Sequence, residues 1–315
     1  MRNDVLVVEI SGKRPGGSRE RPTEKNACGY EHLIISNNSD GYETEWPIVN
    51  VPPDYVEWYK AHAKMSDSAW YAPMNRSYAI KYAREHGFRY LVQLDDNIMF
   101  LEISYCCKIN ENTMKRFRAQ STNSMLDDFI AMMVTVLECT NAGIVGCSLA
   151  GVANPDNSYL SERYVYSIFA LDLQRIPDFY QGDFEDDVEF RLKLAQMGVP
   201  SVQVAPLRYS KVGQQKDKDL SGCRKAYAEV GVKRGDHMRK LYGNVYACGM
   251  RGKSNCIRSE AKAGEAYFKH RLAPFKVGVL VKDKHRIDEK MQELFCKWAK
   301  KRDCKTIVRE KKVKK

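Results

Sequence analysis

The sequence lacks a long apolar run: no stretch among its 315 residues approaches the roughly 18 apolar residues that a membrane-spanning helix needs. The apolar stretch within residues 1–17 is too short for a signal peptide and is better interpreted as a first β-strand. We therefore expect a soluble protein of the cytoplasm. With 43% hydrophobic residues, the chain can bury one large core, or a core with a smaller appendage.

Zinc-binding cysteine patterns are also missing. None of the ten cysteines forms a Cys-x-x-Cys pair, and the six histidines do not complete a zinc spacing. We expect these cysteines to be buried free thiols in a reducing cytosol.

No Walker loop, dinucleotide fingerprint, helix-turn-helix, zinc finger or RNA-binding signature is present either. A nucleic-acid partner can therefore be inferred only from charge, and the net charge is +11 with a pI of about 9.0. Residues 232–240 and 297–315 are densely basic. Such patches are typical of a polyanion partner, chiefly nucleic acid, although a solubilising tail has the same composition.

Short apolar runs alternate with helical patterns through the first 210 residues. This alternation predicts an α/β fold with a mostly parallel sheet flanked by helices. Strands are predicted at 5–10, 32–36, 46–53, 88–94, 144–149, 164–176 and 199–210, and helices at about 75–87, 122–143 and 183–198.

The pattern loosens after about residue 210. We expect a catalytic domain over residues 1–215 and a basic, mainly helical C-terminal extension over 216–315. Within the extension, the sequence favours helices at 222–231, 265–275 and 288–303.

One unusual stretch follows a predicted central strand. In "QLDDN", Asp95, Asp96 and Asn97 stand where that strand ends, and ligands of open α/β sheets bind at the carboxyl ends of strands. Two acids and an amide suit Mg²⁺ or Mn²⁺, which prefer oxygen ligands and often bind a nucleotide diphosphate. The alternative is that these residues only cap a turn.

A second acidic stretch, "GDFEDDVEF", opens the predicted helix at 183–198. One or two acids are common at a helix N-terminus, but this stretch carries five. A carboxylate among Glu185, Asp186 and Asp187 has the chemistry to take a proton from an attacking hydroxyl.

The loop "SGKRPGGSRERP" follows the first predicted strand. Its glycines let the backbone approach a ligand, and Lys13, Arg14, Arg19 and Arg21 offer cations to a phosphate. The alternative is a flexible basic loop without a ligand.

Taken together, "QLDDN", the helix "MNRSYAIKYAREHG" before it and "FEDDVEFRLKLAQMG" after it resemble glycosyltransferases of the GT-A fold. The pattern is most similar to the TET/JBP-associated glycosyltransferases of phages and some eukaryotes. These are thought to glycosylate hydroxylated pyrimidines in DNA, such as 5-hydroxymethylcytosine. The resemblance covers roughly residues 1–225 and implies a nucleotide-diphospho-sugar donor, UDP-sugar first, a divalent metal and a DNA acceptor.

The resemblance assigns roles to particular residues. Asp95 would lie near the ribose or a metal-bound water, while Asp96 and Asn97 occupy the middle and last positions of the metal motif. Asn97 replaces the usual Asp there. Arg76 belongs to the preceding helix, which resembles the family's Arg/Asn-bearing helix, and Ser11 to a loop resembling the first nucleotide-binding loop.

The acid pair and the last loop complete this assignment. The family's Glu-Asp pair matches Glu185-Asp186 or, with the frame moved by one, Asp186-Asp187, and we favour Asp186 or Asp187 as the base of an inverting displacement. Lys211 and Lys216, on a loop predicted after the last strand, would close over the diphosphate.

Three other functions fit parts of the same sequence. A glycosyltransferase that acts on a glycan or small molecule would need no basic surface. A nucleotidyltransferase would share the sheet and metal but react at the α-phosphate. A non-catalytic DNA-binding protein on a degenerate transferase fold would explain Asn97.

Overall fold

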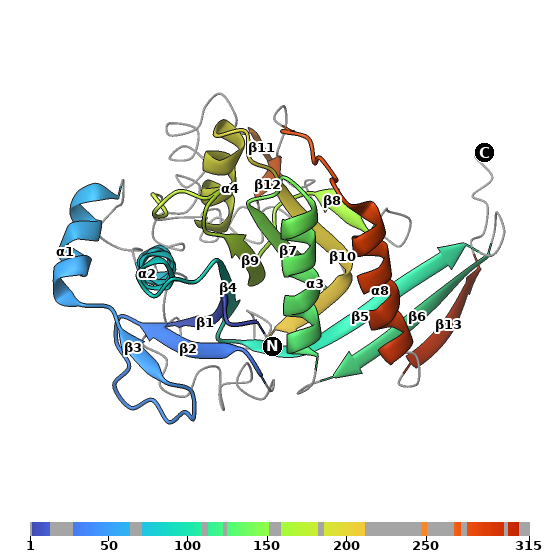
Figure 1. Ribbon diagram of the computed structural model, residues 1–315, viewed down its shortest axis with the longest axis horizontal. Helices are drawn as coiled ribbons and strands as arrows, with labels where there is room; N and C mark the ends of the chain where they lie inside the picture. Colours follow the sequence, from blue (N-terminus) through green and yellow to red (C-terminus); the bar gives the residue numbers. More distant parts are fainter. Residues whose placement is uncertain are drawn as a thin grey trace.

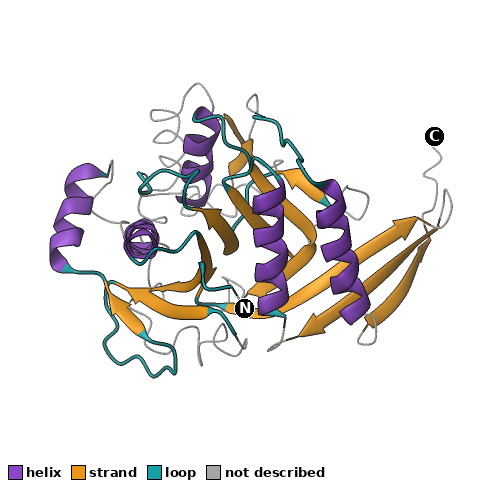
Figure 2. Cartoon of the chain, viewed as in Figure 1, coloured by secondary structure: helices purple, strands orange, loops and turns teal. Residues whose placement is uncertain are grey.

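A computed structural model describes residues 2–12, 28–63, 71–108, 113–121, 125–150, 159–181, 186–211, 247–250, 268–271, 276–298 and 302–308. In these residues the protein is an α/β structure whose large mixed β-sheet is flanked by helices (Figures 1 and 2). The predicted α/β fold class is thereby confirmed.

The described chain forms one sheet of eleven strands in the order β13-β6-β5-β10-β7-β9-β4-β1-β2-β3, with β8 also paired to β10. A separate two-stranded sheet joins β11 to β12. The strands are β1 (Val5–Ser11), β2 (Glu31–Ser36), β3 (Ile48–Asn50), β4 (Tyr90–Asp95), β5 (Ile98–Lys108), β6 (Thr113–Ser121), β7 (Ile144–Leu149), β8 (Leu160–Glu162), β9 (Ile168–Asp172), β10 (Ser201–Lys211), β11 (Ala247–Met250), β12 (Phe268–Arg271) and β13 (Arg302–Val308).

Strand direction differs between the centre and one side of the large sheet. β3, β2, β1 and β4 are parallel. β9 lies antiparallel between β4 and β7, so β4 and β7 share a direction, and β10 is parallel to β7. Six of these seven strands therefore point the same way, as predicted. β5, β6, β8 and β13 add antiparallel pairs, which make the sheet mixed.

Both faces of the central strands are covered. Side chains of α1 (Pro53–His62), α2 (Tyr71–Glu85) and α4 (Asp186–Gln196) share one buried cluster with Leu6 and Val8. Those of α3 (Leu126–Cys139) and α8 (Lys284–Trp298) share the other with Val5 and Val7. Neighbouring residues of β1 thus face opposite layers, which explains why this strand is a continuous apolar run.

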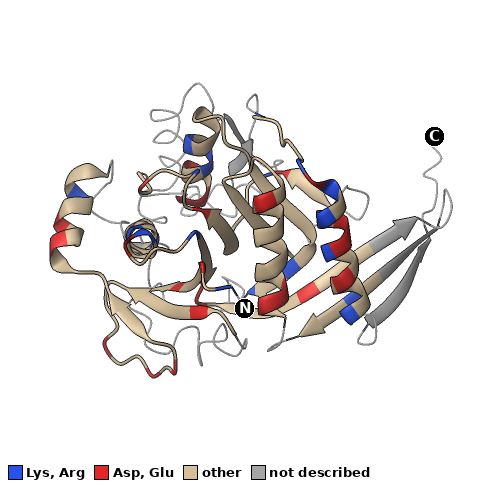
Figure 3. Ribbon diagram, viewed as in Figure 1, with Lys and Arg blue, Asp and Glu red and all other residues tan. Residues whose placement is uncertain are grey.

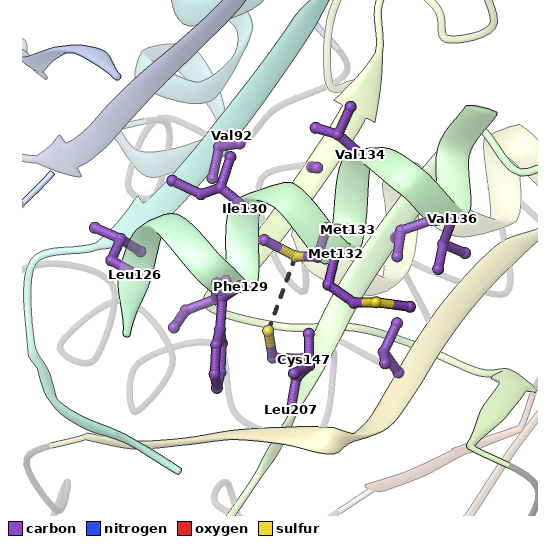
Figure 4. Packing of buried hydrophobic residues seen from close by; sticks show 14 of the residues in the cluster. Val92, Leu126, Phe129, Ile130, Met132, Met133, Val134, Val136, Cys147 and Leu207 are labelled. Carbon is purple, nitrogen blue, oxygen red and sulfur yellow. Dashed lines mark hydrogen bonds between the residues drawn. The ribbon is translucent and has the colours of Figure 1, made fainter. Parts of the chain in front are cut away.

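Helix α3 forms the centre of one apolar layer. Its side chains Phe129, Ile130 and Met133 are fully buried, and they pack with Val92 of β4 and Cys147 of β7 (Figure 4). The Cys147 Sγ atom lies 3.8 Å from the Met133 Sδ atom. Burying so many apolar groups makes this helix a rigid support behind the ends of β4 and β7.

Two described elements of the C-terminal part, α8 and β13, pack with the large sheet and its core. α8 lies beside α3 over the sheet (Figure 1) and contributes Ile287, Met291 and Leu294 to the same core. β13 pairs with β6 and forms one edge of the large sheet. The predicted boundary at 215/216 stays a prediction, but this part of the extension packs against the first 215 residues.

Most predicted elements of the first 210 residues are confirmed, with five differences. α2 begins at Tyr71, earlier than predicted, and α1, β5, β6 and β8 were not predicted. The predicted helix at 265–275 is wrong, because β12 occupies Phe268–Arg271 and pairs antiparallel with β11. Cross-strand pairing overrides helical periodicity there. The predicted helix at 222–231 lies outside the described residues, and the one at 288–303 is confirmed up to Trp298.

The described residues bear on two further expectations. No helix among them has both the length and the apolarity to cross a membrane. Their cysteines with described side chains, Cys28, Cys139, Cys147 and Cys296, are free thiols, and two of these are fully buried. Cys296 is exposed, contrary to the expectation of burial.

We expect Leu294→Ala to lower the free energy of unfolding by about 3 kcal/mol. Leu294 is buried between α8 and α3, and shortening its side chain would leave a cavity there. Urea denaturation followed by tryptophan fluorescence measures this loss. The exposed neighbour Glu293→Ala is the control and should change the free energy by less than about 0.5 kcal/mol. A separate unfolding transition for the C-terminal residues, with an unchanged main transition, would contradict the shared core.

Candidate functional site

A cluster of charged side chains lies at one edge of the central sheet. Asp95 ends β4 and Lys211 ends β10, so both lie at the carboxyl edge of parallel strands. Asp186 and Asp187 begin α4 at this same edge, and Arg76 of α2 reaches it from the layer above the sheet. This is the position where open α/β sheets bind ligands.

Arg76 joins the carboxylates of this cluster. Its Nη2 atom donates to Asp95 Oδ1 at 2.7 Å, and its Nε atom donates to Asp186 Oδ2 at 2.9 Å. Asp187 Oδ1 lies 3.8 Å from Arg76 Nη2, which is an ion pair without a hydrogen bond. A buried guanidinium therefore links the end of β4 to the start of α4.

Buried polar groups hold the Arg76 side chain in place. Arg76 Nη1 donates to Gln93 Oε1 at 3.2 Å, and Gln93 Nε2 donates to the carbonyl oxygen of Arg76 at 3.0 Å. The Tyr180 hydroxyl donates to the same Gln93 oxygen at 3.4 Å. The guanidinium also lies 5.3 Å from the ring centroid of Phe169. Because these partners are themselves buried, they hold the guanidinium in one position.

Asp95 is held as an anion by two cations. Besides Arg76, Lys211 Nζ lies 3.5 Å from Asp95 Oδ2. Burial alone would raise the pKa of Asp95, but Lys211 and Arg76 favour the charged form and lower it to about 2. Lys211 Nζ also donates to Ser167 Oγ at 3.0 Å.

Asp186 and Asp187 are adjacent in sequence but differ in environment. Asp186 accepts a hydrogen bond from Arg76, whereas the buried Oδ1 atom of Asp187 accepts none from the described residues. Burial first, and then the charge of Asp186, raises the pKa of Asp187 to about 7. The Asp187 side chain is still 25% exposed, so a substrate can reach it. Asp187 is therefore suited to accept a proton near neutral pH.

Arg191 lies one helical turn beyond Asp187. Its Nη1 atom donates to the Asp187 carbonyl oxygen at 2.6 Å, while its buried Nε and Nη2 atoms have no hydrogen-bond partner within the described part of the chain. Burial lowers the pKa of this guanidinium. The nearby positive charge limits the rise in the pKa of Asp187 without pairing directly with its carboxylate.

A second polar group forms where β1 and β2 end. Ser11 Oγ donates to Asp96 Oδ2 at 2.8 Å and lies 2.9 Å from the Tyr42 hydroxyl. Asn75 Nδ2 donates to the Ser11 carbonyl oxygen at 2.8 Å. A Cβ atom on Gly12 would lie 2.4 Å from Asn37 Oδ1, so a larger residue there would displace the Asn37 side chain.

The three residues of the predicted metal motif, Asp95, Asp96 and Asn97, differ in how well they fit Mg²⁺ or Mn²⁺. Asp95 is the least suited of the three, because both carboxylate oxygens already face cations. Asn97 Oδ1 is buried and accepts no hydrogen bond from the described residues, which suits an oxygen ligand. Asp96 lies beside it in the turn from β4 to β5. No group of three or more His, Cys, Asp or Glu side chains among the described residues is placed to hold an ion, so phosphate oxygens or water would have to complete the coordination.

The structure brings together part of the predicted site. Arg76, Asp95, Asp186, Asp187 and Lys211 form one cluster. Ser11, Asp96 and Asn97 lie beside it, at the ends of β1 and β4. Lys211 is the last residue of β10 and does not lie on the predicted loop, which corrects its placement. The remaining predicted residues lie outside the described part: Arg14, Arg19, Arg21, Glu185 and Lys216.

Three residues of the site were not predicted. Gln93 carried a visible signal, since an amide inside the apolar run "YLVQL" needs a buried partner. Arg191 carried a similar signal, as a cation among buried positions of α4. Ser167 carried none, because its role depends on backbone conformation and on contacts with two distant strands.

Positive charge is not spread evenly over the chain. Both signs are interspersed on the described ribbon (Figure 3). Acidic and basic residues are equal in number there, so the whole excess of +11 lies in the other segments. Those segments include 13–27, 212–246, 251–267 and 309–315.

Comparison with known proteins adds little. No profile of a known protein family matches the sequence, and no curated protein matches it. Among solved structures, A197 from STIV is similar with a TM-score of 0.35 and 12% sequence identity, over 67% of this chain and 86% of that one. A similarity this weak leaves the function to be argued from the site.

Proposed function

We propose that this protein is a GT-A-type glycosyltransferase that moves a sugar from a nucleotide-diphospho-sugar to a hydroxyl group. The donor that we favour is a UDP-sugar. The observation that carries the proposal is that Asp187, with its pKa near 7, lies in one cluster with two cations at the carboxyl edge of the sheet: Arg76, 3.8 Å from Asp187, and Lys211, which is paired with Asp95. A transfer to a hydroxyl needs a base for the acceptor and positive charge for the departing diphosphate.

Asp187 acts as the base in this reaction. Its carboxylate takes the proton of the acceptor hydroxyl as the oxygen attacks the anomeric carbon, and the bond from that carbon to the phosphate oxygen breaks. Asp186 does not share this role, because its Oδ2 atom already accepts a hydrogen bond from the Arg76 guanidinium at 2.9 Å. Arg76 hydrogen-bonds Asp186 but not Asp187, and through Asp186 and Asp95 it links the start of α4 to the end of β4.

Positive charge receives the departing diphosphate. Lys211 is 25% exposed, and its ion pair with Asp95 is long at 3.5 Å, so the ammonium can bind a phosphate as well. Asp96 and Asn97 would hold a divalent cation, Mn²⁺ or Mg²⁺, which supplies charge neutralisation of the diphosphate when bound.

For the acceptor we propose a modified DNA base, such as 5-hydroxymethylcytosine. The net charge of +11 supports a polyanionic acceptor, and the resemblance to DNA-modifying glycosyltransferases supports the hydroxylated base. An enzyme of this kind reaches the base after the base leaves the duplex stack. A glycan or small-molecule acceptor is the outcome that would replace this part of the proposal.

The test is incubation with a panel of UDP- and GDP-sugars and Mn²⁺, with hydroxymethylated duplex DNA as the acceptor. Nucleotide release and DNA mass are read together, and unmodified DNA, a small-molecule hydroxyl and added chelator serve as separate arms. We expect nucleotide release coupled to a mass gain of one sugar on hydroxymethylated DNA alone. A folded protein that releases nucleotide from no donor with any acceptor would refute the proposal.

Binding to DNA should depend on the basic segments outside the described residues. We expect the replacement of Lys311, Lys312 and Lys314 by Gln to weaken the affinity for duplex DNA roughly tenfold at low salt. The affinity should also depend less on salt, because fewer counterions are released on binding. Fluorescence anisotropy against salt concentration measures both effects.

The matched control replaces three lysines of α8 with Gln: Lys284, Lys290 and Lys297. Each of these is paired with a carboxylate, so its loss should change DNA affinity little. Equal losses in the two triple variants would contradict an origin of DNA binding in residues 309–315.

A further inference from the structure

Ser167 has an unusual backbone. Its φ angle is +62°, and no other non-glycine residue in the described ranges has a positive φ. The left-handed conformation costs roughly 1–2 kcal/mol for residues other than glycine, and serine has no special preference for it. Such strain persists only where surrounding structure requires it, and it clusters at functional sites.

This conformation closes a tight turn at the start of β9. The Ile168 amide donates to the Tyr166 carbonyl oxygen at 2.6 Å, across Ser167. The turn directs the Ser167 carbonyl oxygen toward β4, where it accepts the Asp95 amide at 2.8 Å. Ser167 is 1% exposed, so its position is fully determined by the protein.

The Ser167 side chain contacts the end of β10, which lies beyond β7 in the sheet. Its Oγ atom accepts a hydrogen bond from Lys211 Nζ at 3.0 Å. The pairing of β10 with β5 shifts register between Ser210 and Lys211, which re-aims the lysine at the strand end. One serine thus links the backbone of Asp95 to the ammonium of Lys211.

A glycine would supply the same backbone conformation without strain. Serine differs from glycine by its CH2OH side chain, and the hydroxyl of that side chain contacts Lys211. The strain is therefore coupled to a side-chain contact at the candidate site, and backbone geometry alone does not explain it.

We propose that Ser167 is a positioning residue that presets Lys211, relative to Asp95, for the diphosphate of the donor. The inference rests on the proposed function, because it assigns Lys211 to the leaving diphosphate. It predicts that loss of the hydroxyl weakens donor binding whether or not the backbone strain remains.

The test compares Ser167→Ala with Ser167→Gly. Both lack the hydroxyl, but only the alanine variant keeps the strain, so the glycine variant should melt about 2–4 °C higher than the alanine variant. Both should bind UDP about tenfold more weakly than the wild-type protein, measured by calorimetry with Mn²⁺ present. A merely structural role would make UDP affinity follow the melting temperature.

Ser148 provides the matched control, because it is a buried serine of β7 with an ordinary backbone and a hydrogen bond to Ala205. There the glycine variant should melt below the alanine variant, and both should bind UDP as the wild type does.

Lys211→Met separates the inference from the proposed function. Weak UDP binding by Lys211→Met, with wild-type binding by both Ser167 variants, overturns the role of Ser167 and leaves the function standing. Wild-type UDP binding by Lys211→Met also overturns the inference, because the inference assigns Lys211 to the diphosphate. If the wild-type protein binds neither UDP nor GDP, the proposed function fails and the inference fails with it.

Discussion

Asp187→Asn should reduce the transfer rate about 10³-fold while UDP affinity changes little. The carboxylate supplies the proton acceptor, and general-base catalysis by a side chain typically contributes 10²–10⁴-fold. Asparagine has nearly the same shape but cannot take a proton. Single-turnover transfer with excess enzyme measures the chemical step, and calorimetry with UDP measures donor binding. A rate within threefold of wild type would assign the base to another group.

The pH dependence of the wild-type rate provides a second measurement on the same residue. Because the pKa of Asp187 is about 7, the rate should rise with pH through that value as the carboxylate loses its proton. The residual rate of Asp187→Asn should not show this rise with pH. Asp186→Asn is the matched control: its rate should still rise with pH, but the midpoint of the rise should lie at lower pH because one neighbouring charge is gone.

Asp187→Asn should also stabilise the protein above neutral pH. The folded-state pKa of Asp187 lies above its usual value of 3.8, so the folded state favours the protonated form and loses stability as pH rises through about 7. Asparagine removes this loss. We expect the melting temperature of Asp187→Asn to exceed that of the wild type by roughly 5 °C at pH 8 and to match it near pH 4.

Arg76→Met should lower the free energy of unfolding by about 3–5 kcal/mol at pH 7. The guanidinium is buried and pairs with Asp95 and Asp186, so its removal leaves two close carboxylates without the cation that they share. Methionine fills similar space, which limits the cavity. Urea denaturation measures the loss, and transfer activity should fall with it because α4 loses its link to β4.

The pH dependence identifies the cause of this loss. In the wild type the pKa of Asp95 is about 2, so its ion pairs stabilise the fold above pH 3.8 and lose effect as pH falls toward 2. The deficit of Arg76→Met should therefore shrink toward pH 3. Lys81→Ala on the same helix removes only an exposed pair with Glu85 and should cost less than about 1 kcal/mol. A deficit independent of pH would point to lost packing.

Local patterns predicted the central part of this fold well. Continuous apolar runs such as "VLVVEI" require a strand covered on both faces, and β1 is buried along its whole length. Acids at the start of α4 and at the end of β4 were visible as a site because buried carboxylates need cations. Sequence reasoning failed at β5, β6 and β12, where cross-strand pairing decides the structure: β5 and β6 also pair with the distant strands β10 and β13, and β12 pairs with β11.

The contacts that define the site were beyond sequence reasoning. "QLDDN" predicted a cation beside Asp95, but not that Arg76 and Lys211 would supply it from α2 and β10. It also placed Asp95 among the metal ligands, whereas the structure leaves Asn97 Oδ1 as the buried oxygen without a hydrogen bond in the described chain.

The sequence by itself determined which residue types stand at the carboxyl edge of the sheet, because strand ends follow from local apolar runs. Only the tertiary structure decided which acid is the base. Asp186 and Asp187 are both aspartates at the start of α4, but burial and the charge of Asp186 raise the pKa of Asp187, and the Arg76 guanidinium reaches Asp186 at 2.9 Å and Asp187 only at 3.8 Å. Burial and charge set a pKa through space, and those distances exist only after the chain has folded.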